Sequence, residues 1–200
     1  MADKPIIFSA PMVRALLDGA KTQTRRVLDN KRAVMRDRCD ALDCVRIHVG
    51  DRLWVREAFW TCDDCGHRNM CEGGANHSGH VGRWCCASCD DLLPKAKTSP
   101  IFMPRWASRL TLTVTDVRVQ RLQEISAADS LAEGVQCHTC KAMGQSACNR
   151  RGCFASIDAF RAIWDHINGP GAWAENPWVA AYSFTVQHGN IDMLAEGARQ

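Results

Sequence analysis

Alternating apolar and polar residues mark two strands in the second half of the chain. Apolar residues alternate with threonine over residues 108–122, and the alternation changes phase near Asp116. A second alternating run extends from Trp178 to Val186. Period-two patterning is typical of strands with one buried face, and a phase change indicates a bulge or bend. The pattern therefore predicts two strands, the first of them with a bulge.

Three other segments have the features of helices. Residues 10–19 place apolar side chains on one face, and residues 156–167 repeat apolar side chains at helical spacing. Between them, Ser126 and Asp129 form the pattern of a capping box, with Asp in place of Glu, and Gly134 is suited to end the short helix that follows. The sequence therefore predicts two amphipathic helices and one short capped helix.

Shorter apolar runs predict further strands at residues 5–8 and 52–59. Residues 27–47 are charged and irregular, and the tail after residue 188 is expected to fray. The strands are not interleaved regularly with long helices, which argues against a doubly wound sheet. We therefore expect an α+β fold in which a small mixed barrel carries a few short helices.

Length and charge are those of one moderately basic domain. The 200 residues, with a formal net charge of +3, fit a single domain over 1–200. Basic residues crowd the first third of the chain, which favours a nucleic-acid or phosphate partner. The alternative is that nearby aspartates neutralise the run locally. The basic residues are Arg25, Arg26, Lys31, Arg32, Arg36, Arg38, Arg46, Arg52 and Arg56, and the aspartates are Asp37, Asp40, Asp43 and Asp51.

The twelve cysteines of the chain indicate metal binding. The N-terminus lacks the apolar core of a signal peptide, and no apolar run has the length of a membrane span. We therefore expect a cytoplasmic protein with no membrane partner. Structural disulfides are rare in that reducing compartment, whereas thiolates that bind zinc are common.

Two groups of four cysteines have the spacing of zinc sites. Residues 61–93 form a cysteine-rich insertion that resembles a zinc ribbon, and residues 137–153 form a second one. Four thiolates leave no open position on zinc, so both ions would be structural. The first set is Cys62, Cys65, Cys86 and Cys89, for which Cys85, Cys71, His67, His77 and His80 are alternatives; the second is Cys137, Cys140, Cys148 and Cys153, with His138 as an alternative; Cys39 and Cys44 remain unassigned.

A cluster of polar residues follows the first helix. The segment Gly-Ala-Lys-Thr-Gln-Thr-Arg-Arg spans residues 19–26. A lysine beside hydroxyls and arginines can hold an anion, or can activate a hydroxyl when it loses its proton. A solvated basic loop is the alternative. Either way, we expect the cluster to lie in a loop that leaves the end of the helix.

The Gly-x-Lys-x-x-Thr-x-Arg pattern of this segment resembles the signature loop of ASCH-domain proteins, which belong to the PUA-like superfamily. The runs Val-Gly-Asp-Arg-Leu-Trp-Val at 49–55, Met-Pro-Arg-Trp-Ala-Ser-Arg at 103–109 and Asn-Pro-Trp-Val at 176–179 extend the resemblance. The last two are similar to a phage and prophage branch of the family. The resemblance covers residues 5–187 and implies a PUA-like barrel with the two cysteine-rich segments inserted.

Some ASCH proteins are small amidohydrolases that act on 4-acetylcytidine. Their active loop is similar to residues 19–26, and the resemblance places its lysine, threonine and arginine on Lys21, Thr24 and Arg26. It places the catalytic glutamate on Glu133. It therefore implies Thr24 as the nucleophile, Lys21 as the proton acceptor and Glu133 as the proton donor.

Three functions compete at this point. The first is binding of RNA or a modified nucleoside through a pocket of lysine, threonine, arginine and glutamate side chains, in which Lys21, Thr24 and Glu133 converge and Lys21, Arg25 and Arg26 bind the ligand. The second is hydrolysis of an acylated nucleobase such as 4-acetylcytidine by Lys21, Thr24 and Glu133. The third is a phage interaction or morphogenesis protein whose zinc modules contact a host or phage protein.

The cysteine spacing predicts close to two zinc ions per chain, because each set of four thiolates completes one tetrahedral site. Elemental analysis of protein prepared without chelators measures the content. Folded protein that contains almost no zinc would contradict the prediction.

Overall fold

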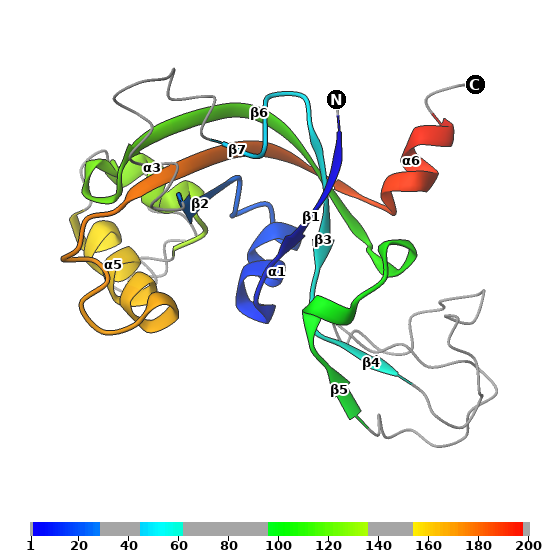
Figure 1. The fold of residues 1–200 in the computed structure, drawn as a ribbon, viewed down its shortest axis with the longest axis horizontal. Helices are drawn as coiled ribbons and strands as arrows, with labels where there is room; N and C mark the ends of the chain where they lie inside the picture. The colour runs from blue at the N-terminus through cyan, green and yellow to red at the C-terminus, as the bar shows by residue number, and fades with distance from the viewer. Residues whose placement is uncertain (1, 29–44, 62–95, 136–153, 198–200) are drawn as a thin grey trace.

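A five-stranded mixed sheet forms the centre of the computed structural model, which describes residues 2–28, 45–61, 96–135 and 154–197 (Figure 1). The strand order is β1-β3-β6-β7-β2; β1 and β3 are parallel, and the other neighbours are antiparallel. The strands are β1 (Asp3–Ile7), β2 (Gln23–Val27), β3 (Arg52–Arg56), β6 (Leu110–Arg121) and β7 (Trp178–His188).

Helices lie under the curved sheet and at both of its ends (Figure 1). Helix α1 lies beneath the arch of β6 and β7, α3 and α5 lie together at one end, and α6 lies at the other. This mixture of sheet and helix confirms the α+β class. No helix in the described ranges is long and apolar enough to cross a membrane. The bounds are α1 (Ala10–Leu17), α3 (Ala127–Ala132), α5 (Phe154–Asn168) and α6 (Ile191–Gly197).

The predicted bulge in β6 is confirmed. The register with β7 shifts between Val114 and Asp116, so that Thr115 has no opposite residue. Leu110, Leu112 and Val114 are buried before the shift. The inward-facing positions move to the odd-numbered residues after it, beginning with Val117. One extra residue therefore keeps an apolar side facing the interior along the whole strand.

Two apolar clusters stabilise the fold. The larger one joins α1 to the sheet and includes Phe8, Val13, Leu53, Leu112 and Tyr182. The smaller one lies where α5 packs on the ends of β6 and β7. Its members are Leu122, Ile125, Val135, Phe160, Trp164, Ala172 and Val179. The helices predicted from period 3.6 thus contribute their apolar faces to two separate cores.

The edge strands β1 and β2 are joined by a side chain. Among the described strands, the recorded ladders do not pair β1 with β2. Instead, Arg26 Nη2 donates a hydrogen bond of 2.7 Å to the Ile7 carbonyl, and its guanidinium lies 5.2 Å from the centre of the Phe8 ring. The sheet therefore curves enough to bring its edges together, and Arg26 bridges the opening of the predicted barrel.

Every cysteine lies outside the described residues, in 29–44, 62–95 or 136–153, so both predicted zinc sites and the interiors of both insertions lie there too. The ends of the first insertion are described. They form a two-stranded ladder between β4 (Phe59–Thr61) and β5 (Ala96–Thr98), in which Thr61 is opposite Ala96. From β5, the chain passes through two 3-10 turns, Pro100–Phe102 and Arg105–Ala107, into β6; a third, Leu122–Glu124, follows β6.

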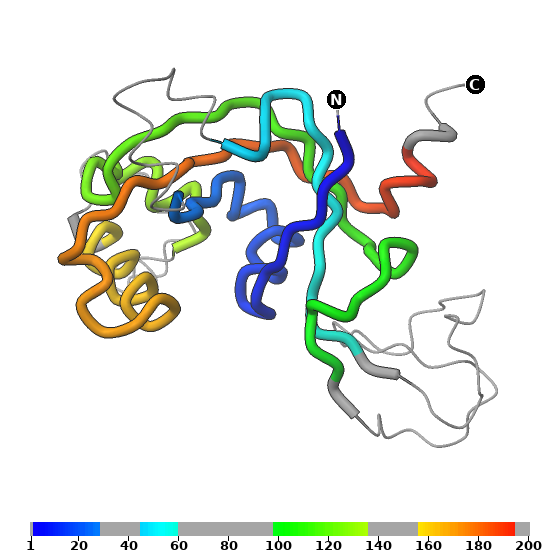
Figure 2. Tube along the Cα trace, viewed as in Figure 1, coloured from blue at the N-terminus to red at the C-terminus, as the bar shows by residue number. Residues whose placement is uncertain are grey.

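Two expectations about local structure are wrong. The polar cluster at 19–26 is not all loop, because β2 begins at Gln23 and pairs with β7 along its length. The path of the chain from α1 into this region is drawn in blue in Figure 2. Backbone pairing, rather than an apolar pattern, forms this strand. The segment after residue 188 does not simply fray, since α6 begins at Ile191, whose side chain is fully buried.

The end of α3 docks on the chain that leads into β2. Thr22 N–H donates to the Ala132 carbonyl at 2.8 Å, and Lys21 and Glu133 form an isolated antiparallel bridge. Gly134 follows with φ +83°, as predicted for a helix-ending glycine. A Cβ atom there would lie 3.0 Å from Ala15 Cβ and 3.1 Å from Lys21 Cβ. Gly134 thus permits both the turn and the close approach.

Replacing Gly134 with alanine should lower the free energy of unfolding by about 2 kcal/mol, because it adds crowding to an unfavourable backbone conformation. Gly19→Ala is a matched control, since Gly19 also has positive φ (+69°) but open space around its Cβ position. We expect it to cost about 1 kcal/mol. Urea denaturation measures both; equal losses would show that the close approach contributes nothing.

A buried aspartate fastens the start of the chain to β3. Asp51 accepts hydrogen bonds from the backbone N–H groups of Ala2 (2.8 Å) and His48 (3.0 Å) and from the Lys4 ammonium. Burial alone would raise the pKa of Asp51. The Lys4 and backbone hydrogen bonds outweigh burial and hold that pKa at about 2.

Asp51 should therefore contribute to acid sensitivity. Its folded pKa lies below its unfolded value, so its stabilising effect is complete above about pH 4 and is lost as the pH falls toward about pH 2. Asp51→Asn should lower the free energy of unfolding at neutral pH. The difference in this free energy between wild type and variant should become smaller in acid. Denaturation across a pH series tests this, with exposed Asp158→Asn as the control. A difference that stays constant with pH would contradict the expectation.

Candidate functional site

A buried lysine and a buried glutamate meet where α3 docks against β2. Lys21 Nζ donates to Glu133 Oε2 at 2.6 Å and to the Glu133 backbone carbonyl at 2.9 Å. The Lys21 residue is 0% exposed and Glu133 is 9% exposed. The Lys21 ammonium also lies 5.7 Å from the centre of the Phe8 ring. The docking of two backbone segments thus brings together groups that are 112 residues apart in sequence.

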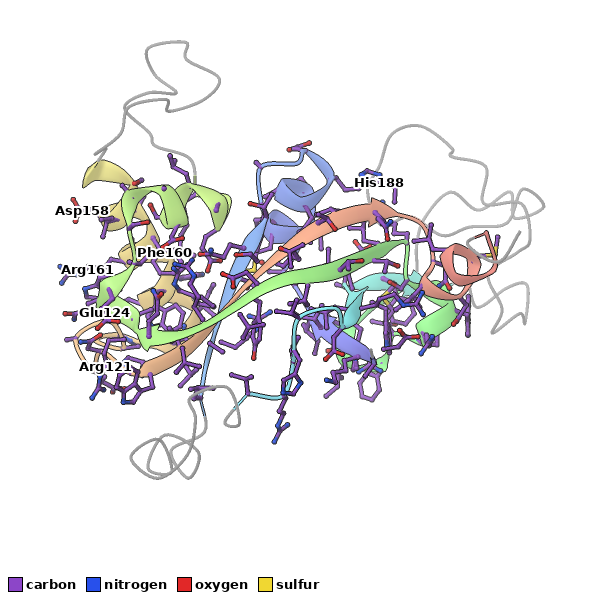
Figure 3. The ribbon with its side chains drawn as sticks, turned by 90° about the horizontal axis from the view of Figure 1, so that it is seen from above. Arg121, Glu124, Asp158, Phe160, Arg161 and His188 are labelled. Atoms are coloured by element: carbon purple, nitrogen blue, oxygen red, sulfur yellow. The ribbon has the colours of Figure 1, made fainter. Side chains whose placement is uncertain are left out.

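Arg25 holds the second oxygen of the same carboxylate. Arg25 Nη1 lies 3.1 Å from Glu133 Oε1 and 2.6 Å from Gln23 Oε1. Its guanidinium carbon is 5.9 Å from the centre of the Phe160 ring on α5. Figure 3 shows α3 and α5 at the same end of the sheet, with Phe160 on α5. Glu133 therefore bridges two cations, one through each oxygen.

Asp129 extends this cluster toward solvent. Its Oδ2 lies 3.3 Å from Arg25 Nη2, and its Oδ1 accepts hydrogen bonds from Arg118 at 2.8 Å and Gln23 at 3.2 Å. The Arg118 side chain is 42% exposed. A chain of alternating charges thus runs from Lys21 through Glu133, Arg25 and Asp129 to Arg118 at the surface. We call these five residues the ion-pair chain.

The geometry of β2 assigns its side chains to two sides of the sheet. Successive residues of a strand point in opposite directions. Gln23 and Arg25 face α3 and α5, as their contacts with Asp129 and Phe160 show. Thr24 and Arg26 therefore face the opposite side, where Arg26 contacts Phe8. The strand divides the basic cluster of the sequence between two environments.

Burial lowers the pKa of the Lys21 ammonium from its ordinary value. The charges of Arg26 and Arg25 act in the same direction, while the Glu133 carboxylate and its hydrogen bond oppose them. For Asp129, burial acts to raise the pKa, but hydrogen bonds from Arg118, Ser126 and Gln23, with the charge of Arg25, hold it at about 2. The cluster therefore combines a lysine that releases its proton more readily with a carboxylate that stays ionised.

The structure brings together some of the residues expected at the site. Lys21, Arg25 and Glu133 are in direct contact, and Arg26 lies beside them, half-buried and close enough for the Glu133 charge to affect its pKa. Thr24 is buried on β2. Within the described ranges, no hydrogen bond joins the Thr24 hydroxyl to Lys21 or Glu133. Thr24, the expected nucleophile, is thus close to Lys21 in sequence, but the Thr24 hydroxyl forms no hydrogen bond with the lysine that was expected to act as its base.

Sequence analysis missed three members of the surroundings. Asp129 was assigned only to the capping box, a role that it does fill through Ser126. Gln23 and Arg118 were given no role. The available signal was the spacing of Gln23 and Arg25: treating 23–27 as a strand would have placed both on one face.

The described residues offer no metal centre. They contain no group of three or more His, Cys, Asp or Glu side chains placed to hold an ion. The cations around Glu133 and Asp129 already occupy the carboxylate oxygens.

No family model and no curated protein matches the chain. Among solved structures, it is similar to an ASCH domain from Lactobacillus crispatus JV V101, at 12% identity and a TM-score of 0.38, over 92% of this chain and 79% of the other. It is also similar to a DUF984 protein from Enterococcus faecalis V583, at 9% identity and a TM-score of 0.41, over 99% and 83%. The first match belongs to the family that the N-terminal motif resembles; neither match assigns a role to a residue of this chain.

Proposed function

We propose that the protein binds RNA or a modified nucleoside at the meeting point of β2 and α3, with Lys21, Arg25, Arg26 and Glu133 as the recognition residues. The observation that supports this most directly is the Lys21–Glu133 contact of 2.6 Å between side chains that are both almost fully buried. The arginines on either side of it add donors that suit a phosphate or a base edge.

The energetics of burial argue for a functional role. Ion pairs lose much of their attraction to the cost of removing both charges from water, so apolar residues of similar volume often stabilise a core as well or better. Here the cost is not fully recovered, because Arg25 Nε is buried without a hydrogen-bond partner in the described residues, and Arg25 Nη2 is close to Asp129 Oδ2 (3.3 Å) but forms no hydrogen bond. Recognition of a ligand would explain why the fold retains a cluster of charges with such a high desolvation cost.

The chemistry of the cluster fits a nucleobase. Guanidinium groups donate to ring nitrogens, carbonyl oxygens and phosphates, which are the acceptors that a nucleotide offers. Proteins that recognise single-stranded RNA read such base edges directly. Arg26, half-buried on the opposite side of β2 from Arg25, is the recognition arginine with a solvent-accessible part.

A second candidate is amide hydrolysis on an acylated nucleobase such as 4-acetylcytidine. It is favoured by the lowered pKa of Lys21, which suits a proton acceptor, and by the Glu133 carboxyl beside it, which suits a proton donor. Thr24 would be the nucleophile. It would have to approach Lys21 when substrate binds, since catalytic hydrogen bonds often tighten only then.

Removing Arg26 should weaken binding of a short single-stranded RNA and reduce the slope of log affinity against log salt by about 0.7, the contribution of one phosphate contact. Fluorescence anisotropy across a salt series measures both. Exposed Arg161 on α5 provides the control: Arg161→Ala makes the same charge change away from the site (Figure 3). An Arg26→Ala protein that stays folded with unchanged affinity and slope would refute the role of Arg26.

Lys21→Met should abolish any deacetylation of 4-acetylcytidine, because methionine retains the apolar stem of lysine and removes the proposed base. Chromatography of the nucleoside products measures turnover. Lys4→Met is the matched control, because Lys4 also pairs with a buried carboxylate, that of Asp51, outside the site. Turnover retained by Lys21→Met would exclude Lys21 as the base. An absence of turnover in the wild-type protein would exclude the hydrolase function and leave binding as the remaining proposal.

A further inference from the structure

Two residues of the ion-pair chain, Arg25 and Asp129, lie between the Lys21–Glu133 pair and Arg118, and neither of them contacts Lys21. Arg25 approaches Glu133 Oε1, while Lys21 uses Oε2. Asp129 approaches Arg25 and does not pair with Lys21. Each of them acts on the lysine through the next residue in the chain. Their geometry is that of supports behind a reactive pair.

We infer that Arg25 and Asp129 are positioning residues, with Asp129 holding Arg25 and Arg25 holding the Glu133 carboxylate against the Lys21 amine. The inference rests on the proposed function, in which Lys21 and Glu133 are the working pair. It assigns a task to Asp129 beyond its capping of α3. It also extends the site along the face of β2 that carries Gln23 and Arg25.

The contacts of Glu133 support this. A carboxylate has two oxygens, and a cation on one of them restricts which way the other can turn. With Arg25 Nη1 on Oε1 at 3.1 Å, Oε2 is left facing the amine at 2.6 Å. The ring of Phe160 and the amide of Gln23 confine the guanidinium in turn. Removing Arg25 would release one side of the carboxylate.

Asp129 keeps this arrangement electrically balanced. Arg25 is fully buried, and its Nη2 has the Asp129 carboxylate 3.3 Å away as counter-charge. The Asp129 carboxylate is anchored independently by Arg118 and by the backbone N–H of Ser126, the residue before α3. Without Asp129, the charge of Arg25 would act on Lys21 with less compensation. Asp129 therefore moderates the effect of Arg25 on the amine.

Within the described ranges, the charged or titratable groups around Lys21 come from three strands and one helix. They are Arg25 and Arg26 on β2, Arg118 on β6, Tyr182 on β7, Asp129 on α3 and Glu133 at the C-terminal end of α3. Removing a cation favours the charged form of the lysine, and removing an anion disfavours it. Arg25 and Asp129 should therefore move the pKa of Lys21 in opposite directions, an effect that loss of packing alone does not produce.

The test is an NMR titration of protein labelled with [13C]lysine, which reports the pKa of each of the six lysines. Comparison with Lys21→Met identifies the Lys21 signal. Arg25→Gln should raise the pKa of Lys21 by about one unit, and Asp129→Asn should lower it by a similar amount, as expected for a charge several ångströms away in a partly screened interior. Arg25→Lys, which keeps the charge, should restore most of the wild-type value.

Ser126→Ala provides the structural control, because it removes the other half of the capping box and leaves the ion pairs of Asp129 in place. It should leave the pKa of Lys21 unchanged. Unchanged values in folded Arg25→Gln and Asp129→Asn proteins, or shifts of the same sign in both, would overturn the inference. If Arg25→Gln fails to fold, Asp129→Asn decides the matter through the sign of its shift.

This result is independent of ligand binding. Wild type that binds neither single-stranded RNA nor 4-acetylcytidine would defeat the proposed function, yet opposite pKa shifts at Lys21 would still support the positioning roles. Binding that survives beside unchanged pKa values would defeat the positioning roles alone.

Discussion

The docking of the end of α3 against the entry to β2 is the contact on which the rest of this structure depends. It is made by the backbone, through the Thr22–Ala132 hydrogen bond and the bridge between Lys21 and Glu133. It joins the region of α1 and β2 to the region of α3 and α5, which otherwise have separate apolar clusters. The same contact removes the Lys21 and Glu133 side chains from water. Architecture and chemistry are therefore determined at one place.

The placement of charge has a cost in stability that apolar packing elsewhere must offset. Lys21, Arg25 and Glu133 occupy interior positions where apolar side chains would cost less. The solvent-exposed end at Arg118 lets the chain of charges reach water without exposing the lysine. The Lys21 side chain is therefore shielded from water, while successive ion pairs link it to the solvent-exposed Arg118.

Much of the fold could be predicted where pattern and packing agree. The change of phase in β6, the capping box before α3 and the turn at Gly134 are all local signals that the tertiary structure retains. β2 could not be predicted in the same way, because its polar residues alternate between two occupied faces and give no apolar period. α6 was not predicted, because its fully buried residue is Ile191, and one apolar residue does not form a periodic pattern in the sequence.

The candidate site was only partly accessible from sequence. Lys21 and Glu133 were expected together through a family resemblance, because a separation of 112 residues leaves no local signal. Asp129 and Gln23 remained hidden because their contacts depend on the face of a strand that was itself missed. A site formed by a strand and the end of a helix can be predicted in full only when it is known which residues of each face one another.

The ladder between β4 and β5 has a consequence for how this chain can vary. Because Thr61 and Ala96 are opposite one another, residues 62–95 leave and re-enter the fold at neighbouring points. The entropic cost of joining two fixed points by a stretch of chain grows only with the logarithm of the number of residues between them. Insertions and deletions in that segment therefore need not disturb the sheet. Related chains can therefore differ in the segment between β4 and β5 without a change in the position of Lys21.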